Sequence, residues 1–494
     1  MPTTASLASG SITVARGRRT STFPSRRARR PSRSPRQRRL LVAGFVALAT
    51  LAAGTAPAAR ASAQSDRSRA TFTEWARSNA VPLRPVDDPY ADSSFDFLRT
   101  LVGSARVLSL GELIHRGHEP LDFRNEVIRY AVTHLGFTAV ALESGFTEAA
   151  VIDRFIQGGP GDVDSILRAG LSWNFGTLAE NRELVLWLRA YNARATRHVR
   201  FYGFDLTGAD PANLADLYLG APLAATAALA YLDQTAPATG ATLASQLTPL
   251  MDRFTPYRYE EFSPGERRRL RAALERLHRT LVAPAATETA AGARFARTRA
   301  RAREARNAWM ALRLDALLAL TPSSAPLIAR ARTPMRDSLM AENVRWILGN
   351  EGDSGRLVVF AHNAHVMNAP GYMWTADTGG LHAAGPPFPM AGQHLRRWLG
   401  PSEVVIIATT SKTVGWGVSP SDPNSVDAAL APVGLPIFVV DLRRSARRPD
   451  IARLLERPWP LRMQTRFVPV APLQATDAIV YFDQVTAESR RTGD

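Results

Sequence analysis

Histidines and carboxylates follow directly after several short apolar runs of this sequence. Neighbouring imidazoles and carboxylates adjust each other's pKa across neutral pH, which suits general acid–base chemistry on a water molecule. The H-x-x-H pair at the end of the set is by itself a weak metal signature, because no third ligand is fixed by spacing. The candidate residues are Glu112, His115, Glu143, Asp205, His362 and His365.

The apolar runs that precede these residues have the length and composition of buried strands. Between the early runs, Asp122–Leu135 and Glu180–Arg194 carry apolar residues at a helical period. This alternation predicts an α/β fold with a mostly parallel central sheet flanked by helices, whose ligands bind beyond the carboxyl ends of the strands. The expected strands are Arg106–Leu110, Thr138–Leu142, Val199–Phe204, Arg356–Phe360, Val404–Thr409, Ile437–Val440 and Ala478–Phe482.

The middle of the chain shows no strand pattern and is rich in Leu, Ala and Arg. We therefore expect an all-helical insertion at 212–332, between a first part of the α/β core at 64–211 and a second part at 333–494. Insertions in α/β enzymes often shape the ligand pocket, so this one is predicted to form a lid over the active-site cleft. A helical hairpin that only supports the core is the alternative.

Composition excludes several classes of protein. The 494 residues contain no cysteine, so disulfides, thiolate metal sites and a cysteine nucleophile are excluded. The formal charge of +17 suggests nucleic-acid binding. However, residues 1–63 hold twelve arginines and no acidic residue, which leaves about +5 for the rest. No nucleic-acid partner is therefore expected, and we expect a small-molecule substrate instead.

Residues 1–63 have the order of a secretory signal peptide: basic, then apolar (Leu40–Gly54), then small (Ala61–Ala63). Cleavage near Ala63 would release an exported protein that is periplasmic or extracellular, with no membrane attachment. Arg38-Arg39 permits a twin-arginine signal, and an uncleaved anchor is the alternative. The apolar run is short for a transmembrane helix.

Other catalytic templates are missing from the sequence. It contains no G-x-S-x-G elbow, no phosphate-binding G-x-x-x-x-G-K-[ST] loop and no H-E-x-x-H pair. A hydrolase that activates water with histidine and carboxylates remains.

Six blocks, in order and with suitable spacing, resemble the erythromycin esterase family from about Ser93 to Val485. Any one block is weak, but six in order are specific. They are L-G-E-x-x-H at Leu110–His115, G-F-x-A-x-x-L-E at Gly136–Glu143, W-L-R-x-Y-N at Trp187–Asn192, G-F-D at Gly203–Asp205, R-D-x-x-M-A-x-N at Arg336–Asn343 and H-N-A-H at His362–His365.

The resemblance implies hydrolysis of an ester, in the best-known members the macrolactone ring of a macrolide antibiotic. It implies that His115 is the general base, that Glu112 and Glu143 orient it, and that Arg124 steadies the pair or the oxyanion. His362 and His365 would complete the water site. Three further residues are expected to bind substrate: Glu119, Glu180 and Asp205.

No cofactor is required by this mechanism, but a divalent metal is possible. Its candidate ligands are His115, His362, His365 and Glu143. One alternative is a hydrolase of the same fold that acts on a different or envelope-related ester. Another is a protein of similar fold that binds a metal or haem. Departures such as Arg116-Gly117-His118, where the family often has Gly-Thr, bear on the substrate more than on the reaction.

Overall fold

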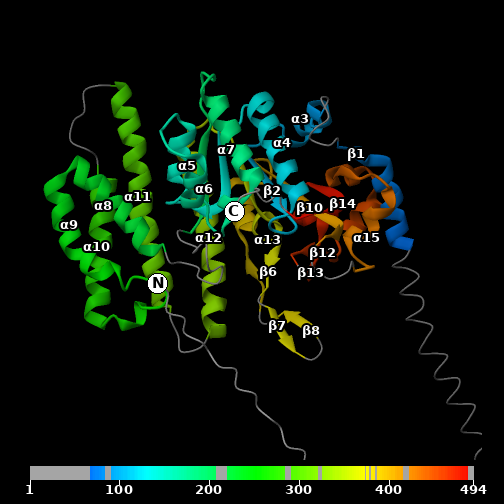
Figure 1. The fold of residues 1–494 in the computed structure, drawn as a ribbon. Coiled ribbons are helices and arrows are strands. Elements are labelled where there is room, and N and C mark those ends of the chain that lie inside the picture. Colours follow the sequence, from blue (N-terminus) through cyan, green and yellow to red (C-terminus); the bar gives the residue numbers. More distant parts are fainter. Residues whose placement is uncertain are drawn as a thin grey trace, which may run out of the picture. The chain divides into compact units, whose positions relative to one another are not determined.

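An eight-stranded sheet organises the chain (Figure 1). The computed structural model describes residues 67–83, 91–206, 220–283, 291–320, 325–372, 374–377, 380–383, 386–415, 422–464 and 466–487. The strand order is β1-β11-β14-β10-β2-β5-β3-β4. The strands are β1 (Val81–Pro82), β2 (Val107–Glu112), β3 (Ala139–Gly145), β4 (Arg200–Asp205), β5 (Leu357–His362), β10 (Val404–Val414), β11 (Ile437–Asp441) and β14 (Ala478–Val485).

The seven strands expected from the sequence are confirmed, and the sheet is mostly parallel. The strands from β14 to β4 in the sheet order are mutually parallel, whereas β11 is antiparallel to β14 and β1 to β11. Parallel strands are covered on both faces, so they are continuous apolar runs rather than alternating ones. Every residue of β2 and of β5 is accordingly buried.

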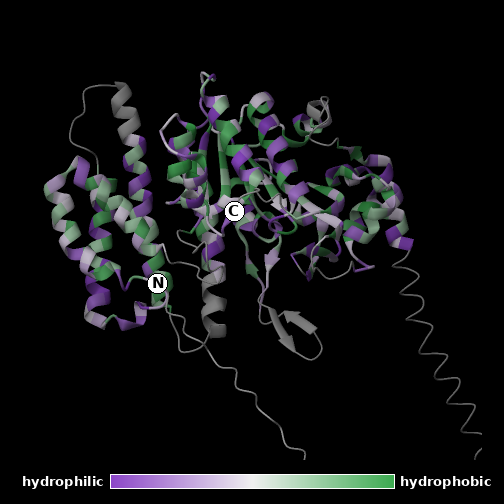
Figure 2. Ribbon diagram, in the orientation of Figure 1, coloured by the Kyte–Doolittle hydropathy of each residue, from purple (hydrophilic) through white to green (hydrophobic). Residues whose placement is uncertain are grey.

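Helices cover both faces of this sheet, and successive strand residues pack into two different cores. In β5, Leu357 and Val359 belong to the core with α12 (Ala325–Glu351) and α14 (Ala391–Leu399). Val358 and Phe360 belong to the other core, with α3 (Phe97–Val102), α4 (His118–Leu135) and α7 (Ala179–Asn192). Hydrophobic residues follow the sheet and the helix sides facing it in Figure 2. The expected α/β fold is therefore confirmed.

Among the described residues of 212–332, the regular elements are helices, joined by turns and loops. It contains α8 (Ala221–Thr235), α9 (Pro237–Met251), α10 (Pro264–Val282) and α11 (Ala291–Ala319). The last helix, α12, continues through the expected boundary at 332–333. The function of the insertion as a lid stays a prediction.

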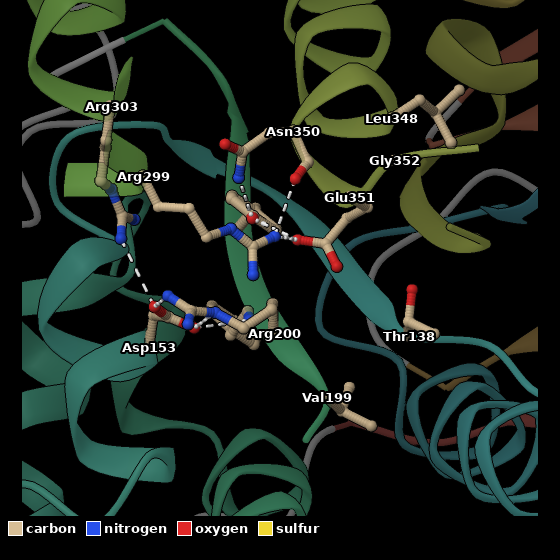
Figure 3. Close-up of polar contacts among 12 residues, drawn as sticks. Thr138, Asp153, Val199, Arg200, Arg299, Arg303, Leu348, Asn350, Glu351 and Gly352 are labelled. Atoms are coloured by element: carbon tan, nitrogen blue, oxygen red, sulfur yellow. Dashed lines mark hydrogen bonds and ion pairs between the residues drawn. The ribbon is translucent and has the colours of Figure 1, made fainter. Parts of the chain in front are cut away.

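Charged side chains join the insertion to the core near the amino end of β4 (Figure 3). Arg303 of α11 and Arg200 of β4 both contact Asp153 of α5 (Ala150–Ile156), and Arg303 Nη1 lies 3.5 Å from Asp153 Oδ2. Arg299 of α11 pairs with Glu351 at the end of α12. The insertion is thus held at the β4 edge of the sheet by several ion pairs.

The expected signal peptide at 1–63 lies outside the described residues, so it stays a prediction. In the part of the chain that the structure describes, no helix is long and apolar enough to cross a membrane.

Candidate active site

Three neighbouring strands end at one edge of the sheet and place their polar residues together. Glu112 is the last residue of β2 and pairs in register with His362, the last residue of β5. Glu143 lies in β3, where the pairing with β4 shifts between Leu142 and Gly145. Such an irregularity re-aims a side chain next to an active site. The strand-end prediction for these three residues therefore matches their positions.

His115 lies in the loop after β2 and contacts Glu112. Its Nδ1–H donates to Oε1 of Glu112, and the backbone N–H of His115 donates to the Gln464 side chain at 3.4 Å. Burial alone would lower the pKa of His115, but the carboxylates of Glu112 and Glu143 outweigh it and raise that pKa above 6.5. The pair has the geometry of an oriented general base.

Glu143 is the acceptor around which the other groups gather. Its Oε2 accepts the backbone N–H of His362 at 2.9 Å, and its Oε1 accepts from Arg336 Nη2 at 3.0 Å. Burial would raise the pKa of this carboxyl, but His365, His115 and Arg336 hold it well below its usual range. Glu143 is therefore ionised at neutral pH.

Arg336 of α12 is a site residue that the residue-by-residue prediction missed. Its guanidinium pairs with Asp205 through two nitrogens, with Nε at 2.9 Å from Oδ1, and also donates to Glu143. The carboxylate of Asp205 pairs with Arg336 in this structure, and substrate binding by Asp205 stays a prediction. The signal was present in the R-D-x-x-M-A-x-N block, where Arg336 precedes Asp337.

Asp337 fixes the orientation of His365. The Nδ1–H of His365 donates to Oδ1 of Asp337 at 2.8 Å, and Arg336 Nη1 lies 3.1 Å from Nε2. Nε2 also lies 3.4 Å from Oε1 of Glu143. Burial lowers the pKa of His365, but Asp337 and Glu143 outweigh it and raise that pKa. Asp337, His365 and Glu143 therefore form a chain of polar contacts.

His362 differs from the other two histidines. Its Nε2–H donates to the Leu113 carbonyl at 3.3 Å, and its Nδ1 accepts the Ala364 N–H at 3.3 Å. Burial, with His115 beside it, lowers the pKa of His362 to about 3. The ring centroids of His115 and His362 are 5.3 Å apart. His362 is thus a neutral ring whose two nitrogens both contact the backbone.

Arg124 of α4 lies against the ring of Phe360 and lines a pocket with two of the site glutamates. Its side chain is buried, lies 4.8 Å from the Phe360 ring centroid and donates to Asn125 Oδ1. Burial lowers the pKa of Arg124 to about 10, even though Glu112 and other carboxylates favour its charged form. Arg124, Glu112 and Glu143 line one narrow pocket together with Phe175. Arg124 is therefore close to both glutamates, and its function in steadying the pair or the oxyanion stays a prediction.

A second, largely apolar cleft of about 200 Å³ opens beside His362. Its walls include Met367, Met390, Phe388 and Met463. The turn between β12 (Trp459–Met463) and β13 (Arg466–Val470) forms one side. This cleft is suited to an apolar part of a substrate.

Left-handed backbone conformations lie around the site. Among the described residues, positive φ at non-glycine positions occurs at Arg116 (68°), Trp173 (62°), Asn174 (57°) and Gln464 (57°). Arg116 lines the narrow pocket, Trp173 lies under the Arg336 guanidinium at 5.6 Å, and Gln464 contacts the His115 loop. Such conformations cluster at functional sites.

Two of the expected substrate-binding residues lie outside this centre. Glu180 of α7 contacts His118 Nδ1 at 2.7 Å, and Glu119 accepts from the Thr486 N–H at 2.7 Å. Glu119 thereby joins α4 to the end of β14. Substrate binding by Glu119 and Glu180 stays a prediction.

Two groups of metal-type ligands occur among the described residues. In each group, the ligand atoms lie within 4.8 Å of one another. Of the expected metal ligands, His115 and Glu143 belong to one group, whose third member is Glu112. The other two expected ligands, His362 and His365, belong to neither group. The groups are Glu112, His115 and Glu143, and His118, Asp122 and Glu180.

The fold and the site define an α/β protein with a histidine–carboxylate centre at the carboxyl ends of a parallel sheet. The family described as erythromycin esterase matches residues 132–485. The chain belongs to the erythromycin esterase family. The match begins after Glu112, His115 and Arg124, so these three residues are placed by the motif and by the geometry.

Known proteins agree with this placement. Over 306 residues the chain is 27% identical to the erythromycin esterase type II of Escherichia coli, covering 60% of this chain and 70% of that protein. A crystal structure of a Bacillus cereus protein superposes with a TM-score of 0.66 at 20% identity, covering 86% of this chain and 99% of that one. An open-conformation mutant of the erythromycin esterase EreC gives a TM-score of 0.57 at 16% identity, covering 83% and 98%. Membership of this family supports an esterase-type hydrolase.

Proposed function

We propose that the protein is an exported hydrolase that cleaves a carboxylic ester, the macrolactone ring of a macrolide, with water activated by His115. The contact between His115 Nδ1 and Glu112, beside the ionised Glu143, carries this proposal. Family membership supports the ester as the bond that is cleaved. The signal-like segment at 1–63 is the basis for export.

In the proposed reaction, a proton is removed from water, the hydroxide attacks the ester, and the proton is returned to the leaving group. With its Nδ1 proton held by Glu112, His115 accepts a proton from water on its other ring nitrogen. The resulting hydroxide attacks the ester carbonyl, and the developing oxyanion is stabilised by the guanidinium of Arg124. Glu143 then favours the imidazolium of His115, which returns the proton to the leaving alcohol.

A divalent metal fits one part of the centre. The ligand atoms of Glu112, His115 and Glu143 lie within 4.8 Å of one another, and Oε2 of Glu112 is buried with no hydrogen-bond partner among the described residues. These residues would hold the ion, which when bound would supply Lewis-acid chemistry and lower the pKa of water. His362 fits less well, since both of its ring nitrogens contact the backbone.

A smaller ester is the second candidate substrate. The cleft beside His362 measures about 200 Å³, below the range of ~300–1,000 Å³ for sites that take drug-sized ligands. That volume favours a short acyl or alkyl group over a complete macrolide.

The test is turnover by purified residues 64–494, followed by mass spectrometry with erythromycin and a panel of p-nitrophenyl esters. A water-mass gain on erythromycin that is lost in His115→Ala and kept in His198→Gln, an exposed control, supports the macrolide. Turnover of the panel alone supports the smaller ester.

The same assay separates an enzyme from a binding protein. Glu112→Gln and Arg124→Met should each remove most of the activity of an esterase, whereas a metal- or haem-binding protein would show no turnover in any form. Absence of turnover of every ester by the folded protein refutes the proposed function.

A further inference from the structure

A cavity of about 480 Å³ lies within the helical region, away from the candidate active site. Residues of α10, α11 and α12 line it, and its size is within the range of small-molecule sites. Trp346 lies ten residues after Arg336 on α12, which is about 15 Å along the helix axis. The cavity is therefore separate from the candidate active site.

A buried arginine without a carboxylate partner forms part of its wall. Arg306 is 9% exposed. Its Nε and Nη2 donate to Oδ1 of Asn343 at 2.9 and 2.7 Å, and the guanidinium lies 3.5 Å from the centroid of Trp309. Asn343 is neutral and its amide also donates to the Phe204 carbonyl. Among the described residues, the Arg306 guanidinium contacts Asn343 and Trp309, neither of which carries a charge.

Two other arginines near Arg306 add to the positive charge around the cavity. Arg313 lies 5.7 Å from the same Trp309 ring, and Arg301 donates to the last carbonyls of α10. Burial lowers the pKa of Arg306 to about 9, and Glu342 is the carboxylate that partly opposes this without contacting it. A buried cation is costly unless an anion or several hydrogen bonds compensate it. The cavity is thus short of negative charge.

Most of the remaining wall is apolar, and His278, Thr298 and Arg301 are its polar members. Leu281 of α10, Ala302 and Ala305 of α11, and the partly exposed rings of Trp309 and Trp346 line the space. An occupant would therefore need both an apolar body and one negative group.

We propose that this cavity binds an anionic amphiphile: a carboxylate on an extended apolar chain. The carboxylate pairs with the Arg306 guanidinium, and the chain lies against Trp309 and Trp346. A planar guanidinium recognises carboxylates well, and a stacked aromatic ring keeps it in position. The proposal does not depend on the esterase reaction.

The test is calorimetric titration of the purified full-length protein with dodecanoate below its micelle concentration, with tryptophan fluorescence as a second signal. We expect saturable one-to-one binding. Dodecanol and dodecyltrimethylammonium have the same chain with a neutral or a cationic head, so they should bind at least tenfold more weakly. This comparison needs no variant.

Two variants and a control locate the site. Arg306→Met should weaken dodecanoate binding at least tenfold, and Ala305→Trp, which fills the cavity, should abolish it. Arg279→Gln removes an exposed charge of α10 and should bind as the wild type does. Each variant is first checked for folding by its melting curve.

Three results would overturn the proposal. They are no binding by the folded wild type, equal binding of dodecanol, and binding that persists unchanged in folded Arg306→Met and Ala305→Trp. The last result would place the ligand elsewhere, for example in the cleft beside His362.

Discussion

Removal of the Arg336 guanidinium should destabilise the protein and loosen the candidate active site together. Arg336 is buried and contacts three groups: Asp205 through two nitrogens, Glu143 at 3.0 Å and His365 at 3.1 Å. The substitution Arg336→Gln leaves two buried carboxylates facing a neutral amide. The expected result is a large loss of folding free energy for a single substitution.

The magnitude follows from the burial of the partners. The side chains of Asp205 and Glu143 are 2% and 6% exposed, so solvent cannot screen them. Breaking a buried ion pair by removal of one partner costs about 3–5 kcal/mol. We therefore expect a loss of about 3–5 kcal/mol at pH 7, measured by urea unfolding with tryptophan fluorescence.

The pH dependence of this loss has a definite sign. The folded-state pKa of Glu143 lies below its ordinary 4.5, in part because of Arg336. A carboxyl with a depressed pKa stabilises the fold above its unfolded pKa, and this stabilisation is lost as the pH falls through the folded pKa. The difference between wild type and Arg336→Gln should thus be full at pH 7 and shrink below about pH 4.5.

A double-mutant cycle provides the control. Asp205→Asn in the Arg336→Gln background removes a charge that has already lost its partner, so the second step should cost less than it does in wild type. We expect a coupling energy of about 1–3 kcal/mol. A loss under about 1 kcal/mol, or two additive substitutions, would refute the view that Arg336 holds the centre together.

Further predictions concern the acid–base groups. His115→Gln should lower ester hydrolysis by about 10²–10⁴-fold, with His198→Gln unchanged, and equal rates would exclude His115 as the base. The acid limb of the pH profile of kcat/KM should have its midpoint above 6.5, since neutral His115 is needed and its pKa is raised; a midpoint below 6.5 would contradict this. Asp337→Asn should lower the pKa of His365 in an NMR titration, and an unchanged value would show that Asp337 does not set it. If a divalent metal binds at the centre, Glu112→Gln should weaken its uptake in a direct binding assay, and unaltered uptake would place the metal elsewhere.

The strands could be predicted from the sequence because a parallel strand covered on both faces is a continuous apolar run. Val404–Thr409 was expected as a strand, and it lies within β10. The sheet order could not be predicted in the same way. β10 lies between β14 and β2, and that neighbourhood depends on contacts between segments far apart in the chain.

The candidate site was predictable where it depends on strand ends and less so elsewhere. Glu112, Glu143 and His362 follow apolar runs, and parallel strands bring their carboxyl ends to one edge. Arg336 lies inside a long helix, and its partners depend on how α12 is placed after the insertion. Glu119 contacts Thr486, beyond the last strand, and no local pattern indicates that contact.

The three histidines of the centre show how environment separates residues of one type. Burial lowers the pKa of all three, and the outcome depends on what faces each ring. Carboxylates face His115 and His365, with Glu143 acting on both, so the pKa of each is raised. At His362, burial and the neighbouring His115 outweigh the opposing effects of Glu143 and the Leu113 carbonyl, and its pKa falls to about 3. Groups whose pKa values are pushed apart in this way take different parts in acid–base chemistry. His115 and His365 are therefore the rings whose charged forms the carboxylates favour, whereas His362 stays neutral and its backbone N–H donates to Glu143.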